Sequence, residues 1–193
     1  MPNHSISLVF FALASYLIGS IPFSFLVPKV FAQIDIRQHG SGNPGASNVA
    51  RICGKPYGFL SLSLDVAKGI AAVFLLQYFA LPLVLGTLAI LGHITTPFLK
   101  FSGGKGVATT LGCISYISWP AGLVFVIAWA TALTIWNYAG LSSLLAICTT
   151  PIVFLILGVN KPLLWTSMGL VALIFLTHRK NIERLVTGGE HNM

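Results

Sequence analysis

Residues 106–160 read GVATTLGCISYISWPAGLVFVIAWATALTIWNYAGLSSLLAICTTPIVFLILGVN, a run of 55 residues without one charged side chain. A helix needs about 20 mostly apolar residues to cross a bilayer core of roughly 30 Å, so this run has room for two or three crossings. Residues 5–28 form a second uncharged run. A soluble core explains neither run, and we therefore expect an all-α membrane protein with several spans.

The composition and the start of the chain support the same class. Charged residues make up 8% of the sequence, against about 25% in soluble domains. A cleavable signal peptide is the alternative for residues 1–20, because Ala12-Leu13-Ala14 resembles a cleavage site. However, no lysine or arginine precedes Lys29, and apolar sequence continues past the proposed site. We interpret this segment as an uncleaved first span.

Cysteine spacing and net charge limit the cofactors and partners. The three cysteines lack the paired spacing of a disulfide framework or a zinc site. His39 and His93 have no carboxylate or second histidine at ligand spacing, so we expect no metal and no cofactor. The formal net charge of +7 is better explained by basic loops facing anionic lipid headgroups than by nucleic acid. We expect membrane lipid, and no nucleic acid, as a partner.

The distribution of basic residues predicts the orientation. Seven apolar segments have the character of spans, although several are short or contain proline. They comprise residues 5–27, 57–79, 80–94, 107–119, 121–137, 143–159 and 162–177. With seven crossings, nine of the eleven Lys and Arg residues share one side, which the positive-inside rule makes cytoplasmic. This predicts an external N-terminus, a cytoplasmic C-terminus and one domain over residues 1–193; six crossings would place the basic tail outside.

The first polar stretch, DIRQHGSGNPGASNVAR at 35–51, combines three glycines, two hydroxyls and two amides within nine residues. Such a backbone turns sharply and presents N–H groups, which suits an anion such as phosphate. Arg51 can complete this site with its planar guanidinium. An ordinary surface loop is the alternative, because Gly, Ser and Asn are common in loops.

The second polar stretch, GHITTPFLKFSGGKGVAT at 92–109, places a lysine between glycines directly before an apolar helix. The amides and the positive helix end can join the ammonium of Lys105 around a phosphate. It is not a Walker A motif, because Gly106 stands where a hydroxyl is required. Within the second expected span, Asp65 and Lys68 are spaced i, i+3, and we interpret them first as a structural ion pair.

The third polar stretch, HRKNIERLVTGGE at 178–190, follows the last expected span. His178 and Asn181 can share one helix face there, whereas a basic stop-transfer tail is the alternative. Ser142 and Ser143 stand at the head of the sixth expected span, where serine is also common as a helix cap.

Taken in this order, the three stretches resemble the bacterial acyl-phosphate:glycerol-3-phosphate acyltransferases, the PlsY family, over essentially the whole chain. The family signatures look like DIRxxGSGNxGAxNxxR, GHxxxxFLxFxGGKGVAT and HRxNIxRLxxGxE, with the serine pair between the last two. The resemblance implies transfer of a fatty acyl group from acyl phosphate to the 1-hydroxyl of glycerol 3-phosphate. The products would be lysophosphatidic acid and inorganic phosphate, in the first acylation step of phospholipid biosynthesis.

The resemblance also implies a location and a set of site residues. It places the enzyme in the bacterial inner membrane, with a cytoplasmic active site and possible coupling to the soluble enzyme that makes acyl phosphate. The implied catalytic residues are Lys105, Ser143, His178 and Asn181. The implied substrate-binding residues are Ser41, Gly42, Asn43, Gly45, Asn48, Arg51, Gly103, Gly104, Gly106 and Glu190. The proton acceptor stays open between His178 and a phosphate oxygen of the substrate.

Several positions depart from the family pattern, and two other classes of membrane protein are the alternatives. The departures are Ser47, Thr95-Thr96-Pro97, Ser102, Asn137 and Gly140. A phosphate or phospholipid transporter would need polar residues deep along a path, which residues 107–159 lack. A CDP-alcohol phosphotransferase would need clustered aspartates for metal, and the chain has only Asp35 and Asp65.

Overall fold

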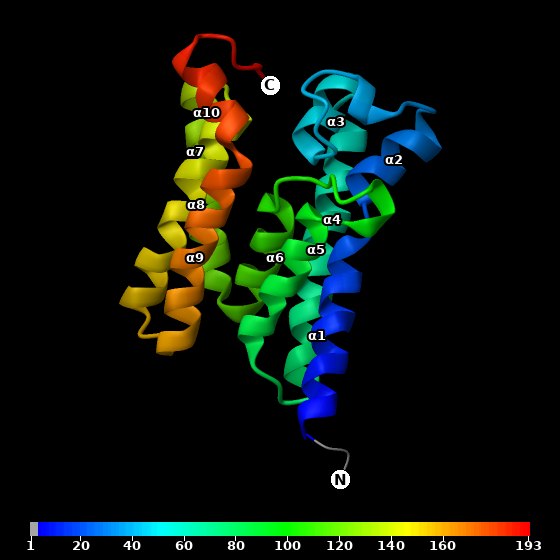
Figure 1. Ribbon diagram of the computed structural model, residues 1–193. Helices are drawn as coiled ribbons and strands as arrows, with labels where there is room; N and C mark the ends of the chain where they lie inside the picture. Colours follow the sequence, from blue (N-terminus) through cyan, green and yellow to red (C-terminus); the bar gives the residue numbers. More distant parts are fainter. Residues whose placement is uncertain (1–3) are drawn as a thin grey trace. The chain divides into compact units, whose positions relative to one another are not determined.

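The computed structural model describes residues 4–193, which form helices joined by loops (Figure 1). No strand occurs among these residues. Contacts divide the chain into two compact units, Met1–Ile117 and Ser118–Met193. The first two polar stretches therefore belong to the first unit, and the serine pair and the third stretch belong to the second.

The first unit is built around α4, which packs against α1, α2, α3 and α6. Its α-helices are α1 (His4–Ser20), α2 (Phe23–Phe31), α3 (Ala46–Cys53), α4 (Lys55–Tyr78), α5 (Thr87–Ile94) and α6 (Val107–Ile117). Its short 3-10 helices are η1 (Ile36–Gln38), η2 (Leu83–Gly86) and η3 (Pro97–Leu99). In Figure 1, α1 lies beside α5, and the two helices are in contact.

Small residues bring the helices of this unit together. A methyl group on Gly69 of α4 would lie 2.3 Å from the carbonyl oxygen of Thr109 in α6. From the other side, a methyl group on Gly112 would lie 2.1 Å from the carbonyl oxygen of Val66. Close backbone approach through small residues is typical of helix packing in membranes. The glycines at these two positions thus hold α6, and the loop before it, against α4.

The second unit consists of three long helices and a short terminal one. They are α7 (Trp119–Trp136), α8 (Ala139–Ile156), α9 (Lys161–Thr177) and α10 (Arg179–Val186). α8 packs against both α7 and α9. α10 continues from α9 after a bend of 59° and also contacts α8. The bend brings the polar residues of α10 back over the end of α8.

All seven predicted spans contain helix, but their lengths differ. Among residues 4–193, four helical segments are long and apolar enough to cross a bilayer, and the bent pair α9 and α10 makes a fifth if it is one span. α6 has 11 residues, which extend only about 16 Å at 1.5 Å per residue. The number of crossings and the orientation stay predictions.

Two boundaries in the polar regions differ from the sequence prediction. The stretch 28–56, which lies between the first two predicted spans and is expected from the sequence to be a loop, contains α3, whose Val49 is fully buried. α8 begins at Ala139, so Ser143 lies inside its first turns and is not at the head of the helix. The apolar pattern of α3 is too short to indicate a helix, and the apolar run around α8 is too continuous to mark where that helix starts.

Candidate active site

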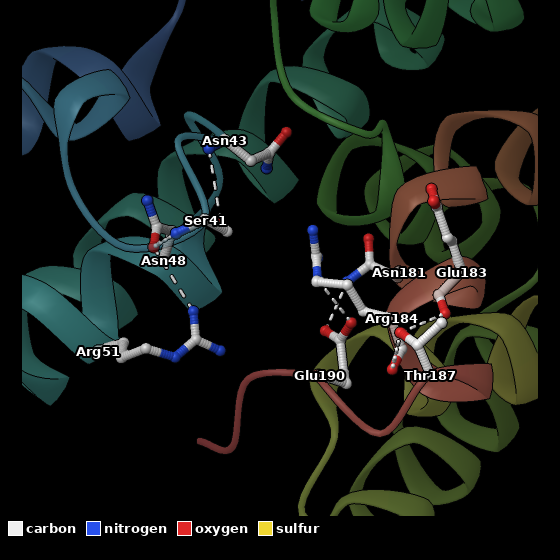
Figure 2. Close-up of polar contacts among 9 residues, drawn as sticks. All are labelled: Ser41, Asn43, Asn48, Arg51, Asn181, Glu183, Arg184, Thr187 and Glu190. Carbon is white, nitrogen blue, oxygen red and sulfur yellow. Dashed lines mark hydrogen bonds and ion pairs between the residues drawn. The ribbon is translucent and has the colours of Figure 1, made fainter.

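Asn48 organises the first glycine loop, which comprises residues 39–45. Its side chain, projecting from α3, is 3% exposed. Nδ2 donates to the carbonyl oxygens of Ile36 at 3.3 Å and His39 at 3.0 Å, while Oδ1 accepts the amide of Ser41 at 3.1 Å. Figure 2 shows Asn48 between this loop and Arg51, whose Nη1 lies 3.5 Å from the same oxygen. One buried amide therefore holds the loop and also contacts the guanidinium of Arg51.

The glycines of this loop allow its sharp turns. Gly40 and Gly42 have φ angles of +58° and +71°, a region that residues with a side chain rarely adopt. The amide of Gly42 donates to the His39 carbonyl at 3.0 Å, and that of Gly45 to the Asn43 carbonyl at 2.9 Å. In this arrangement these two amides stabilise the loop itself, so the hydroxyl of Ser41 and the side chain of Asn43 are its better candidates for substrate contact.

Asp35 and Arg37 form an ion pair just before the first glycine loop. Arg37 donates from Nε and Nη2 to the two carboxylate oxygens of Asp35, at 2.9 and 2.6 Å. The Arg37 hydrogen bond lowers the pKa of Asp35 to about 2. Because this pKa lies below the ordinary value, the pair is complete above about pH 4 and is lost as the pH falls toward 2. It does not respond to pH in the physiological range.

The second glycine loop, residues 100–106, is attached to the end of α5. The amide of Gly103 donates to the Ile94 carbonyl at 2.9 Å, and that of Gly104 donates to the His93 carbonyl at 3.1 Å. Methyl groups at these glycines would lie 2.0 Å from His93 O and 2.1 Å from His93 Nε2, respectively. The predicted use of these two amides as phosphate donors is therefore not what this structure shows. The glycines permit close approach to α5, and their N–H groups hold the loop there.

Lys105 and Gly106 connect this loop to α6. Gly106 has a φ of +89°, which allows the chain to turn into the helix that begins at Val107. The predicted place of the lysine, directly before an apolar helix and within a glycine frame, is confirmed. Its ammonium and the start of α6 are the groups of this loop suited to an anion.

Ser143 of the second unit is buried between α7 and α8. Its hydroxyl donates to the Ala139 carbonyl at 2.8 Å and accepts from Nε1 of Trp129 at 3.2 Å. Ser142 likewise donates to the Tyr138 carbonyl, at 2.9 Å. Trp129 was not predicted, because its position beside Ser143 depends on how α7 and α8 pack. The indole N–H orients the hydroxyl, a prerequisite for binding substrate in one geometry.

His178, Asn181 and Glu190 are tied to the bend between α9 and α10. Nδ1 of His178 lies 2.8 Å from the Ile174 carbonyl, so in the neutral imidazole Nδ1 carries the proton and Nε2 is the acceptor. Asn181 donates from Nδ2 to Glu190 at 2.7 Å, and Arg184 donates from Nε to the other carboxylate oxygen at 3.0 Å (Figure 2). The structure thus brings Glu190 against the helical bend, a contact that the sequence did not predict.

Gly140, one of the departures, also belongs to this cluster. A methyl group there would lie 2.7 Å from Nδ2 of Asn181. The absence of a side chain at this position is what lets α10 bring Asn181 against α8. A serine at this position would require the amide to move away from its present contact with Glu190.

Comparisons with known proteins identify the family of this chain. The family described as Glycerol-3-phosphate acyltransferase matches residues 9–188. Glycerol-3-phosphate acyltransferase 2 of Thermotoga maritima is 40% identical over 188 residues, covering 95% of each chain. The enzyme of Pelagibacter ubique is 41% identical over 177 residues, covering 90% of this chain and 91% of its own. This chain belongs to the glycerol-3-phosphate acyltransferase family.

Solved structures of the same family show the fold. The crystal structure of PlsY (YgiH), an integral membrane glycerol 3-phosphate acyltransferase, matches in its glycerol 3-phosphate form with a TM-score of 0.90 at 35% identity. That match covers 97% of this chain and 96% of the other. Its lysophosphatidic acid form matches with a TM-score of 0.88 at 34% identity. The predicted class, an all-α integral membrane protein with several spans, is confirmed.

Proposed function

We propose that the protein transfers a fatty acyl group from acyl phosphate to the 1-hydroxyl of glycerol 3-phosphate. The observation that carries this proposal is the pair of PlsY structures, solved with glycerol 3-phosphate and with lysophosphatidic acid, whose fold covers nearly all of this chain. The charge pattern of the site residues supports it, because both substrates carry phosphate and both glycine loops are accompanied by a basic side chain. We further propose that residues 1–193 act as one domain.

The chemistry requires positioning and charge stabilisation more than a protein nucleophile. The hydroxyl oxygen forms an ester bond to the acyl carbon, and the bond from that carbon to the phosphate oxygen breaks. The hydroxyl proton leaves with the released phosphate or is taken by a base. Because acyl phosphate is a mixed anhydride, it is already activated, and no covalent acyl-enzyme is needed.

Each set of residues has a role that its geometry supports. Lys105 neutralises a phosphate, while Gly103, Gly104 and Gly106 give its loop the required shape. Arg51 binds the phosphate of glycerol 3-phosphate, with further contacts from the first glycine loop. These contacts come from Ser41 and Asn43, while Gly42 and Gly45 allow the turns of the loop that Asn48 organises.

The second unit supplies the groups for the reacting atoms. Ser143 and Asn181 orient the attacking hydroxyl or stabilise the carbonyl oxyanion, and Glu190 holds Asn181. The tautomer set by the Ile174 carbonyl leaves Nε2 of His178 as the nitrogen able to accept a proton. The alternative acceptor is a phosphate oxygen of the donor.

The choice of donor gives the direct test. Purified protein in detergent is offered acyl phosphate, acyl-CoA, an acyl carrier protein thioester or CDP-diacylglycerol, each with glycerol 3-phosphate. We expect lysophosphatidic acid from acyl phosphate without added divalent metal. Full activity with acyl-CoA alone, or its abolition by EDTA, would reject the proposal.

A labelling experiment tests the location that we propose for this activity. We propose the inner membrane, with the substrate-binding loops on the cytoplasmic face. Single cysteines at positions 41, 105 and 190 should then react with an impermeant reagent only from the cytoplasmic side. Reaction at position 105 from outside would contradict this orientation.

A further inference from the structure

A buried charged cluster lies in the first unit, outside the three polar stretches that carry the proposed function. Nζ of Lys68 lies 2.7 Å from Oδ1 of Asp65, and both side chains are at most 2% exposed. This confirms the ion pair predicted from their spacing. Moving two charges out of water costs more than their attraction returns unless further hydrogen bonds complete the pair. The neighbours of the pair therefore indicate what it is for.

Those neighbours connect the pair to the break between α1 and α2. Nζ of Lys68 also donates to the carbonyl oxygen of Ile21 at 2.7 Å. The hydroxyl of Ser24, in the first turn of α2, donates to Oδ2 of Asp65 at 2.5 Å. Pro22 follows Ile21 directly and interrupts the helix, and the ammonium binds an oxygen at this interruption. The pair thus joins α4 to both helices at their break.

The third neighbour connects the pair to the second glycine loop. Nδ1 of His93 lies 3.6 Å from Oδ1 of Asp65, close enough for electrostatic attraction but longer than a hydrogen bond. The opposite ring nitrogen, Nε2, faces Gly104 so closely that an added methyl group would lie 2.1 Å away. The backbone carbonyl of the same histidine accepts the Gly104 amide. One residue of α5 therefore contacts both the buried carboxylate and the loop that carries Lys105.

We propose that Asp65, Lys68 and His93 form a positioning group that fixes the second glycine loop, and with it Lys105, against the membrane helices. The ion pair holds the carboxylate, the carboxylate faces the imidazole, and the imidazole sets how closely Gly104 approaches α5. The expected loss of acyl transfer rests on the proposed function, whereas the expected loosening of the second glycine loop does not.

The test separates positioning from simple stabilisation. Asp65→Asn and Lys68→Met each leave one buried charge without its partner, so each should lower the melting temperature. The double variant Asp65→Asn/Lys68→Met has no buried charge and should recover most of that loss. Ser61→Ala changes another buried polar side chain of α4, whose hydroxyl makes no hydrogen bond to the pair, and serves as the matched control.

Two readouts are measured on these variants: acyl transfer, and hydrogen exchange of a peptide spanning 101–106. In the double variant we expect exchange of the Gly103 and Gly104 amides to accelerate about tenfold or more. Acyl transfer should fall by a similar factor, at a melting temperature near that of the unaltered protein. Ser61→Ala should change neither. A double variant with unaltered exchange overturns the proposal and leaves the pair a purely structural feature.

A second set of variants tests the contact between the imidazole and the loop. Gly104→Ala places its methyl group against a side-chain atom of His93, whereas Gly103→Ala places it against the backbone oxygen of the same residue. Adding His93→Ala should therefore slow loop exchange in the Gly104→Ala background and not in the Gly103→Ala background. Equal effects in both backgrounds would overturn the role of the imidazole.

The two proposals fail in different ways. In one outcome, the unaltered protein transfers no acyl group from acyl phosphate while the loop amides still exchange faster in the double variant. The proposed function is then wrong and the positioning group is supported. If transfer occurs normally and exchange is the same in the double variant, the positioning group falls and the function stands.

Discussion

The first glycine loop takes its shape from one side chain, whereas the second takes its shape from the end of a helix. Asn48 makes three hydrogen bonds to backbone atoms around residues 36–41. The second loop instead gives the amides of Gly103 and Gly104 to carbonyls of α5. Both loops contain glycines and a nearby basic side chain, yet substitutions should affect them differently. The first loop should be sensitive to loss of the Asn48 side-chain amide, and the second to a methyl group added at Gly103 or Gly104.

The same difference decides what a substitution of the basic residue near each loop would measure. Arg51 lies within reach of the side chain that organises its loop. Lys105 follows two glycines that are held through their own backbone. Shortening Lys105 therefore removes a charge and leaves the backbone hydrogen bonds of Gly103 and Gly104 in place, so the effect on activity reports the lysine side chain.

The largest effect is expected for Lys105→Ala, which should insert and fold normally but lose nearly all acyl transfer. Losing a charge-assisted hydrogen bond costs about 1.5 to 3 kcal/mol, roughly ten- to a hundredfold for each affected step. Lys100→Ala is the control, because it removes the same charge from the same loop outside the glycine frame. It should retain most activity. Comparable rates at equal membrane expression would mean that Lys105 only marks the cytoplasmic side.

Gly103→Ala should come next, because its methyl group would meet the His93 backbone oxygen at 2.0 Å. Backbone cannot rotate away as a side chain can, so the loop must shift, at a cost of about 1 to 3 kcal/mol. We expect acyl transfer to fall about tenfold or more. Gly169→Ala in α9 is the matched control, since nothing lies within 4 Å of its methyl position. Equal activity of the two variants would argue against close contact between the loop and α5.

Sequence patterns predicted the parts of the fold that depend on local composition. The apolar runs gave the helices, and the i, i+3 spacing gave the pair of Asp65 and Lys68. They did not reveal α3, because a glycine-rich stretch leads directly into a helix of only eight residues. Hydrophobic periodicity needs a longer window than that to indicate a helix.

The candidate site was predictable in its residues but not in its contacts. Glycines suggested amides that bind an anion, whereas the structure uses several of those amides within the protein. His93 showed no carboxylate at ligand spacing, yet folding brings Asp65 to 3.6 Å. Such partners come from distant segments, and one sequence contains no information on which helices pack together. Trp129 beside Ser143 is another contact of this kind.

Asn48→Asp should have a smaller effect that is specific to the first loop. The aspartate keeps an acceptor for the Ser41 amide but loses both donors to the Ile36 and His39 carbonyls. Each lost hydrogen bond costs about 1 kcal/mol. Because Arg51 and the loop both contact the side chain of Asn48, we expect the KM for glycerol 3-phosphate to rise roughly tenfold, with a smaller change in kcat. Gln38→Ala, an exposed neighbour, should leave both constants near their original values.

The smallest effect should arise at the tail of the second unit, where a side chain again does the organising. Arg184 and Asn181 donate to different oxygens of Glu190, so Arg184→Ala leaves the contact to Asn181 in place. Partly exposed ion pairs contribute about 0 to 1 kcal/mol, and we expect less than about a fivefold loss of kcat. Glu190→Ala removes the acceptor of Asn181 and should cost clearly more. Steady-state kinetics on both variants decides the matter: if Arg184→Ala costs as much as Glu190→Ala, the carboxylate acts through the arginine, and its proposed hold on Asn181 is wrong.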